Sequence, residues 1–349
     1  MLITAIIKYI LAFILLILIG FIIQKYITQT YLGTYQVTPS VELDNQLIAN
    51  KNYGKLQKFD LANYSGPESF VNHGGSLYTS VIQGEILRIT NSEIYTHAKL
   101  GLRNCVGFHE CGRPLGLKLF NNSEYILVTD AYLGVYSISI ESGSVKKLFP
   151  MDARFSVTFF DDAVILPNGS LIITEASTKY FLEQLWSALL EGAPSGRLIM
   201  VDTKTGEYSH ILGDLLLRLS LDSGKVTVFA DGLPGFPDNI KSSPRGGYWV
   251  PLSNLRDEPL SAFLLKYLPS FPRIRQLISG FISIFPFKIT PNGKSSMLIR
   301  LDENGKIIEI LNDFQNELPN ACEVLEHDNT LYIGSYYLSY FGKLERLSN

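Results

Sequence analysis

Cysteine is scarce in this sequence, and protein classes that depend on clustered cysteine or histidine are disfavoured. The 349 residues include 3 cysteines, and no Cys-x-x-Cys pair occurs, which argues against a zinc site. The 5 histidines form no metalloprotease motif, and the absence of a Gly-x-Ser-x-Gly elbow argues against a serine hydrolase. A charge excess is also lacking, because 30 basic and 33 acidic residues leave a net charge of −3. Nucleic acid is therefore not an expected partner.

Aromatic residues and turn-forming residues are plentiful by contrast. The chain has 20 Phe, 19 Tyr, 28 Gly and 16 Pro, a mixture that is typical of a β-rich fold with many turns. The length is sufficient for one large domain or two ordinary ones.

One long hydrophobic run lies at the amino terminus. Residues 3–23 are almost wholly apolar, and Lys8 is the one charged residue among them. The run matches the roughly 20 residues that cross a bilayer core, and no small-x-small cleavage site follows it. We therefore expect residues 1–26 to be an uncleaved transmembrane signal-anchor, with a cleaved signal peptide as the alternative. Lys8 and Lys25 are too balanced to set the orientation.

Two other features favour a lumenal or extracellular location for the rest of the chain. Cys105 and Cys111 stand six residues apart in a loop-like stretch, and a disulfide between them would require an oxidising compartment. Two free thiols are the alternative. Acceptor triplets for N-glycosylation begin at Asn63, Asn121 and Asn168. Together these features predict a glycosylated, single-pass type II membrane protein.

A turn followed by a short apolar and aromatic strand recurs along the rest of the chain. The copies lie at residues 75–80, 125–130, 169–175, 247–250 and 330–335. Repeats of about 40–50 residues, each a small antiparallel sheet, are typical of a β-propeller. We expect an all-β propeller over residues 56–349, preceded by a tether and first strand over residues 27–55.

The spacing of the repeats is irregular at two places. Between Ile172 and Trp249 lie a short helical insertion at residues 180–191 and a stretch in which one strand repeat is missing. Residues 215–229 resemble the outer hairpin of a blade whose inner strands are absent. The second irregularity is an apolar, proline-broken insertion at residues 255–289. It could form amphipathic helices that rest on a membrane, or a lid packed on the propeller rim.

Several motifs give the chain a family resemblance. They are Gly66-Pro67-Glu68-Ser69, Cys111-Gly112-Arg113-Pro114-Leu115-Gly116, Asp130-Ala131-Tyr132, Ser195-Gly196-Arg197-Leu198, Leu-Pro-Gly-Phe-Pro-Asp-Asn-Ile at residues 233–240, and Glu323-Val324-Leu325-Glu326-His327-Asp328. In this order they resemble strictosidine synthase-like proteins, in particular the animal branch with an amino-terminal anchor. The resemblance implies a six-bladed propeller outside the cytosol, of which blade 4 is incomplete here. More distantly, the chain is similar to paraoxonases, gluconolactonases and diisopropylfluorophosphatase, which are calcium-dependent hydrolases.

The resemblance also implies a calcium site on the propeller axis. Glu68 matches a carboxylate ligand, Asp161 stands where the family usually has Asn, and Asp238 and Asn239 match an Asp-Asn motif. Oxygen atoms of this kind are the ligands that calcium prefers. The family's fourth ligand, in a Pro-Asn-Gly-Val turn, is missing together with the inner strands. We therefore expect calcium binding to be weak or absent. Local hydrogen bonding in strand-entry turns is the alternative role for these side chains.

A catalytic carboxylate is expected on the last blade. In strictosidine synthases a glutamate there does acid–base work, and Glu323 or Glu326 lies near that position, with Glu323 favoured. The histidine pair of paraoxonases has no evident counterpart.

Three functions follow from these residues. The favoured one is calcium-assisted, arylesterase-like hydrolysis of small esters or lactones, because a bound cation can polarise a carbonyl oxygen. A non-catalytic lumenal or cell-surface binding propeller is the main alternative. A condensation enzyme of the strictosidine synthase type is the weaker one.

Overall fold

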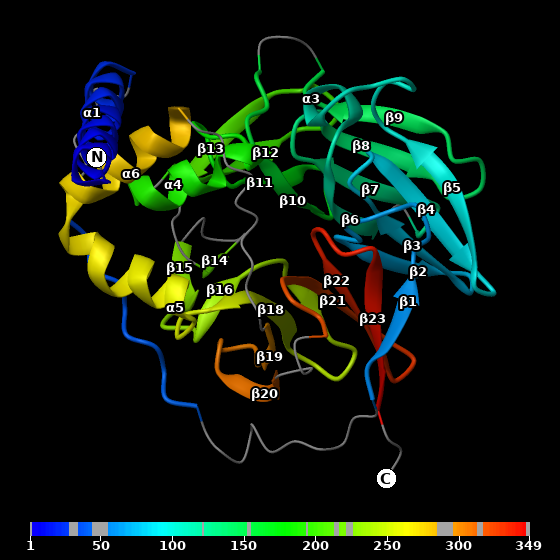
Figure 1. Ribbon diagram of the computed structural model, residues 1–349. Coiled ribbons are helices and arrows are strands. Elements are labelled where there is room, and N and C mark those ends of the chain that lie inside the picture. The colour runs from blue at the N-terminus through cyan, green and yellow to red at the C-terminus, as the bar shows by residue number, and fades with distance from the viewer. Residues whose placement is uncertain are drawn as a thin grey trace. The chain divides into compact units, whose positions relative to one another are not determined.

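The computed structural model describes ten stretches of the chain, which form two compact units. These stretches are residues 2–27, 34–43, 55–120, 122–151, 155–192, 195–212, 216–220, 226–284, 296–312 and 317–346. The helical unit comprises Met1–Pro39, Leu182–Pro194 and Pro259–Thr290. The propeller unit comprises Ser40–Phe181, Ser195–Glu258 and Pro291–Asn349. Figure 1 shows the elements of both units.

Three four-stranded antiparallel sheets follow one another in the first part of the propeller unit. The first contains β2 (Phe70–His73), β3 (Ser76–Ser80), β4 (Glu85–Thr90) and β5 (Glu93–Lys99). The second contains β6 (Pro114–Phe120), β7 (Tyr125–Asp130), β8 (Gly134–Ser139) and β9 (Val145–Phe149). The third contains β10 (Phe160–Ile165), β11 (Leu171–Glu175), β12 (Arg197–Val201) and β13 (Tyr208–Leu212). Each is a meander in sequence order, as expected for a propeller blade.

Two further multi-stranded sheets complete the series. One contains β16 (Gly235–Pro237), β17 (Lys241–Ser242), β18 (Tyr248–Leu255), β19 (Met297–Leu301) and β20 (Ile307–Asn312). The other contains β21 (Ala321–His327), β22 (Thr330–Ser335), β23 (Tyr340–Glu345) and β1 (Gln57–Asp60). The register of β1 against β23 runs from Gln57 opposite Lys343 to Asp60 opposite Tyr340. A strand from the start of the unit thus completes its last sheet, and the fold is an all-β propeller.

A two-stranded sheet lies in sequence between the sheet of β10–β13 and the sheet of β16–β20. It contains β14 (Leu216–Leu219) and β15 (Val226–Ala230), and in the described residues no other strand pairs with it. This hairpin lies where the sequence predicted an incomplete fourth blade.

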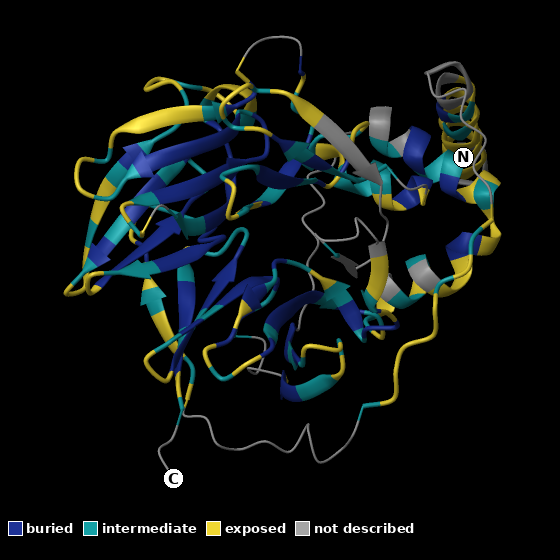
Figure 2. Ribbon diagram, turned by 180° about the vertical axis from the view of Figure 1, so that it is seen from behind, coloured by how far each residue is buried: buried dark blue, intermediate teal, exposed yellow. Residues whose placement is uncertain are grey.

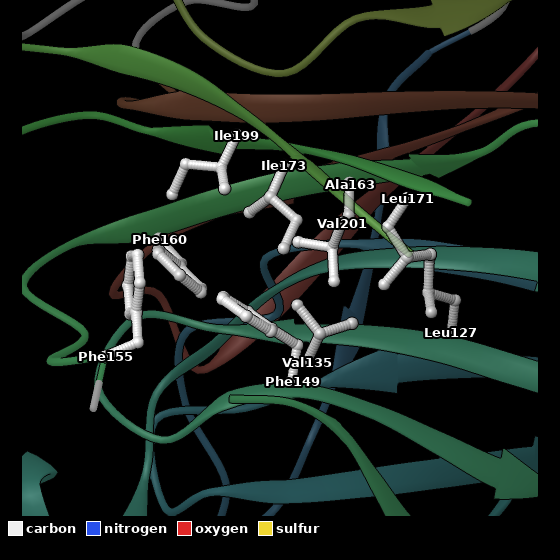
Figure 3. Close-up of a cluster of buried hydrophobic side chains, with 10 residues drawn as sticks. All are labelled: Leu127, Val135, Phe149, Phe155, Phe160, Ala163, Leu171, Ile173, Ile199 and Val201. Carbon is white, nitrogen blue, oxygen red and sulfur yellow. The ribbon is translucent and has the colours of Figure 1, made fainter. Parts of the chain in front are cut away.

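The hydrophobic core lies between neighbouring sheets. Figure 3 shows one such layer, in which Leu127 and Val135 of the second sheet meet Leu171, Ile173 and other apolar residues of the third. Four comparable clusters fill other parts of the unit. The last strands β5 and β9 are less buried than the second strands β3 and β7 of the same sheets (Figure 2). Packing between sheets therefore holds their inner strands more firmly than their outer ones.

The helical unit is built from the amino-terminal helix and both insertions. Its elements are α1 (Leu2–Ile27), η1 (Leu182–Gln184), α4 (Leu185–Glu191), α5 (Pro259–Ala262), the π-helical turn η2 (Phe263–Tyr267), η3 (Leu268–Ser270) and α6 (Pro272–Ile284). Helix α6 contacts both α1 and α4. The buried Arg275 guanidinium donates to the carbonyl oxygens of Leu190 (3.1 Å) and Glu191 (2.7 Å) and lies 4.8 Å from the Tyr35 ring. In the part of the chain that the structure describes, no helix is both long enough and apolar enough to cross a membrane.

Candidate functional site

The residues expected to form the site come from the first strands of their sheets. Strand β2 contacts β6 and β21, β6 contacts β10, and β17 contacts β21. Glu68 precedes β2, Asp161 lies on β10, Asp238 and Asn239 lie between β16 and β17, and Glu323 lies on β21. The pKa of Asp238 is raised by burial first and then by the negative charges of Glu68, Asp161 and Glu323. The four predicted carboxylates therefore share one electrostatic environment.

Glu68 is buried and held in an ion pair. Its Oε2 accepts a hydrogen bond from Arg113 Nη2 at 2.6 Å, and both side chains are almost fully buried. Arg113 Nη1 also donates to the Gly66 carbonyl oxygen at 3.1 Å, which fixes the guanidinium. Burial raises the pKa of Glu68, and Arg113 opposes that shift. One carboxylate oxygen of Glu68 is thus committed to Arg113.

Glu323 is the centre of a polar network. Its Oε2 accepts from Ser69 Oγ (2.7 Å), and its Oε1 accepts from the Phe70 N–H (2.5 Å) and from Lys241 Nζ (2.7 Å). Lys241 Nζ donates to the Phe70 carbonyl oxygen as well. Burial lowers the pKa of Lys241, and the charge of Glu323 opposes this shift. The network locks Glu323 in one orientation.

Asp161 and Asp162 lie side by side on β10 in different settings. Lys118 Nζ on β6 pairs with Asp162 Oδ2 at 2.5 Å. For Lys118, burial lowers the pKa, but Asp162, Glu323 and Asp161 together outweigh burial and leave it raised. For Asp161, burial and then repulsion from Asp162 and Glu68 raise the pKa to about 7. Asp161 can therefore change its charge near neutral pH.

Asn239 is a buried amide whose side chain has no partner in the described residues. Its side chain is 4% exposed, and neither Oδ1 nor Nδ2 has a hydrogen-bond partner in the described residues. Its backbone N–H donates to the Cys322 carbonyl oxygen at 3.0 Å, so the residue itself is firmly placed. Buried amides without partners are costly, and a bound ligand would remove that cost.

With every carboxyl group ionised, the site would carry two more negative charges than positive ones. Its carboxylates belong to Glu68, Asp161, Asp162, Asp238 and Glu323, and its cations to Arg113, Lys118 and Lys241. Each cation pairs with one carboxylate, which leaves Asp161 and Asp238 without an ion pair in the described residues. Carboxylate and amide oxygens are ligands that calcium accepts, but among the described residues no three His, Cys, Asp or Glu side chains are arranged to hold a metal ion.

Three site residues were not anticipated as functional. Arg113 belongs to a family motif, and Lys118 is a single charge on the apolar strand β6, so the sequence offers a reason to expect a functional role for both. Lys241 lies two residues after the Asp238-Asn239 motif, and this closeness is a reason to expect a role in the same site. Glu326 lies away from these contacts, because Arg245 (2.6 Å), Ser243 (2.6 Å) and Trp249 (2.8 Å) hold its carboxylate.

The disulfide between Cys105 and Cys111 is confirmed. It closes a loop that contains the short helix α3 (Phe108–Cys111). The His109 ring on α3 lies 4.8 Å from the rings of both Tyr132 and Phe181. Cys322 is buried and free. The loop thus holds an aromatic group in a fixed position.

Two of the three predicted glycosylation positions lie in the described residues, and both are exposed. Asn63 and Asn168 are exposed, whereas Asn121 lies outside the described residues. Glycosylation at the three positions stays a prediction.

Two solved structures share the fold at low sequence identity. A proposed gluconolactonase matches with a TM-score of 0.53 and 10% identity over 88% of this chain and 97% of its own. A gluconolactonase from Xanthomonas campestris matches with a TM-score of 0.51 and 10% identity over 90% of this chain and 97% of its own.

Sequence comparison identifies the family. The strictosidine synthase family matches residues 161–231, and the amino-terminal region of strictosidine synthase-like proteins matches residues 49–89. Adipocyte plasma membrane-associated protein of Salmo salar is 30% identical over 80% of this chain and 75% of its own length. The Gallus gallus protein of that name is 30% identical over 84% of this chain and 79% of its own length. Strictosidine synthase-like 2 of Arabidopsis thaliana is 28% identical over 79% of this chain and 86% of its own length. The chain belongs to the strictosidine synthase-like family.

Proposed function

We propose that this protein is a membrane-attached, six-bladed propeller that hydrolyses small esters or lactones with the help of calcium. The observation that carries the proposal is the pair of uncompensated carboxylates, Asp161 and Asp238, beside the unpartnered amide of Asn239. Membership of a family related to calcium-dependent hydrolases supports the same reading. In this proposal the β14–β15 hairpin is the incomplete fourth blade.

The cation would be held by few ligands. Asp161, Asp238 and Asn239 would supply oxygen atoms, and Glu68 would add the oxygen that Arg113 does not occupy. These side chains would have to draw together around the ion, because no three described acidic side chains are arranged around one point. Bound calcium would polarise the carbonyl oxygen of a substrate. Because Arg113, Lys118 and Lys241 add positive charge to the same site, we expect affinity below that of calcium sites with four unpaired protein ligands.

Glu323 is the proposed acid–base residue. A carboxylate offers about four acceptor positions, and three are occupied by Ser69, Phe70 and Lys241. The position that remains can accept a proton from an attacking water or a substrate hydroxyl. Lys241 keeps the carboxylate oriented, and a carboxylate held in this way could act as a base.

An esterase and lactonase assay on the full chain in detergent, with and without chelator, tests this function. We expect calcium-dependent hydrolysis that Glu323→Gln lowers by roughly 100-fold, as for loss of general acid–base catalysis. Glu93→Gln, at an exposed position, is the matched control. Activity that survives the chelator would reject the role of calcium.

A non-catalytic binding propeller is the second candidate. The ion pairs Arg113–Glu68 and Lys241–Glu323 favour it, because they hold two predicted functional carboxylates in internal contacts. A protein that binds calcium without hydrolysing any ester or lactone tested would support this candidate.

Membrane attachment is proposed through the amino-terminal segment. The vertebrate relatives are named as plasma membrane-associated, and α1 exposes apolar side chains such as Ile10, Phe13 and Leu18. Resistance of the full chain to alkaline carbonate extraction is expected, and complete extraction would contradict an integral anchor.

A lumenal or extracellular propeller is proposed with it. Endoglycosidase should then increase the gel mobility of the expressed protein, and Asn63→Gln and Asn168→Gln should each remove part of that shift. Unmodified protein in a eukaryotic host would argue against this orientation.

A further inference from the structure

The second insertion exposes a cluster of large apolar side chains within the helical unit. Phe263, Tyr267, Phe271 and Ile274 are 47%, 52%, 51% and 44% exposed. The rings of Phe263 and Tyr267 lie 6.2 Å apart, as expected for neighbours four residues apart on a helical turn. We call these four residues the aromatic cluster. Monomeric soluble proteins rarely leave such side chains together in water.

The opposite side of the same segment is already packed. Leu268 and Arg275 are 3% and 1% exposed, and Arg275 is fixed by carbonyl groups of α4. Residues on α6 therefore divide between a buried side and the exposed side that carries Ile274. This amphipathic division is typical of helices that lie at an interface.

The charge of the segment identifies the kind of partner. Residues 259–284 contain no Asp or Glu, whereas Lys266 and Arg273 are exposed next to the aromatic cluster. Lys266 Nζ lies 5.6 Å from the centre of the Tyr267 ring. Basic and aromatic side chains at the edge of an apolar face match the headgroup region of a bilayer, where aromatic rings settle and basic side chains reach lipid phosphates.

The aromatic cluster also belongs to the same unit as α1. Helix α6 contacts α1, whose apolar side chains are themselves exposed (Figure 1, Figure 2). A membrane that receives α1 would therefore have the second insertion close to its surface.

We propose that residues 259–284 form a second membrane contact, with the aromatic cluster in the headgroup–acyl boundary and Lys266 and Arg273 at lipid phosphates. This contact adds to the anchor proposed for α1 and does not depend on the catalytic proposal. Its effect would be to hold the helical unit against the bilayer surface.

Fluorescence quenching on the full chain tests the contact. Ser270→Cys places a thiol at an exposed position beside Phe271, while Cys322 is buried and Cys105 and Cys111 are bonded to each other. The variant is labelled with an environment-sensitive dye and reconstituted in phosphatidylcholine vesicles that contain a spin-labelled lipid. Ser142→Cys, at an exposed loop of the propeller unit, is the control.

We expect quenching at position 270 to exceed that at position 142 by about twofold or more, because the dye would sit at the headgroup level. The triple change Phe263→Ser, Tyr267→Ser, Phe271→Ser should reduce it to the level of the control. Lys266→Gln with Arg273→Gln, at exposed positions, should lower the quenching in part, because two contacts with lipid phosphates would be lost.

Vesicle flotation separates the two membrane proposals. If the protein floats with vesicles but the dye at position 270 is not quenched above the control, the second contact is wrong and the α1 anchor stands. If the protein does not float, both are wrong. Quenching that the triple variant leaves unchanged would also overturn the second contact.

Discussion

Lys118 is a long basic side chain among carboxylates, and its position bears on what else the site can hold. It pairs with Asp162 at 2.5 Å and interacts with Asp161 and Glu323. An ammonium group in this place repels a second cation, while its removal would leave Asp162 as an additional negative charge. Arg113 and Lys241 act in the same direction on Glu68 and Glu323.

Substitution of Lys118 by Met is expected to strengthen calcium binding. Loss of one like charge at short range should be worth about 1.4 kcal/mol, or roughly tenfold in affinity. Isothermal titration calorimetry on Lys118→Met and on the exposed control Lys146→Met measures the difference. Equal affinities for both variants would show that Lys118 does not compete with the cation.

The raised pKa of Asp161 makes stability depend on pH. The pKa of this carboxyl rises from 3.8 in the unfolded chain to about 7 in the fold, because of burial and neighbouring charges. The native state then binds more protons than the unfolded state between these values, so stability falls as pH rises from about 4 to about 7.

In chelator, the melting temperature of the wild type should therefore drop by more between pH 5 and pH 8 than that of Asp161→Asn. Added calcium should restore stability to the wild type at pH 8. An identical pH dependence in the two proteins would contradict the shift.

The loop that contains helix α3 is held by close backbone packing as well as by the disulfide between Cys105 and Cys111. Gly84 has a φ of +76°, and a Cβ atom there would overlap the carbonyl oxygen of Cys111. A Cβ atom on Gly101 would overlap the carbonyl oxygen of Glu110. The loop that carries His109 therefore packs on two positions where only glycine fits without movement.

Gly84→Ala should destabilise the fold by about 2–4 kcal/mol, the sum of a strained φ and a displaced loop. Gly74→Ala is the matched control, since Gly74 has a φ of +55° but open space around its Cα. It should cost only about 1 kcal/mol. Urea unfolding gives both values, and similar costs would mean that α3 moves without penalty.

The propeller as a whole has one weak sector. The described residues of β14 and β15 pair only with each other, while every other sheet has at least four strands. The sheet thus presents backbone groups that a complete blade would pair. In the proposed calcium site, the remaining ligand implied by the family resemblance would lie in the same sector.

Insertion of the missing inner strands from a relative after Leu212 should raise both the melting temperature and the affinity for calcium. The new strands would pair the open edge, and their Asn would complete the ligand set. A glycine–serine insert of equal length controls for loop length. If the chimaera matched this control in both measurements, the sector would not limit the site.

Much of the fold follows from local pattern, but the inner contacts of the site do not. Turn-plus-strand repeats such as the one at residues 125–130 and the loop between Cys105 and Cys111 are local, so they were predictable. The pairing of Arg113 with Glu68 joins residues 45 apart, and that of Ser69 with Glu323 joins residues 254 apart. Such contacts depend on how neighbouring sheets stack. Strand position could place the carboxylates together, but it could not show which cation would neutralise each one.

The seam between β1 and β23 has a mechanical consequence. The chain enters the propeller unit's last sheet at Gln57, and β1 is held to β23 over four residue pairs. A pulling force applied to the chain directly before Gln57 would therefore be delivered first to this seam. The lifetime of the closed ring under a pulling force is then set by the rate at which β1 separates from β23, the last strand of the chain.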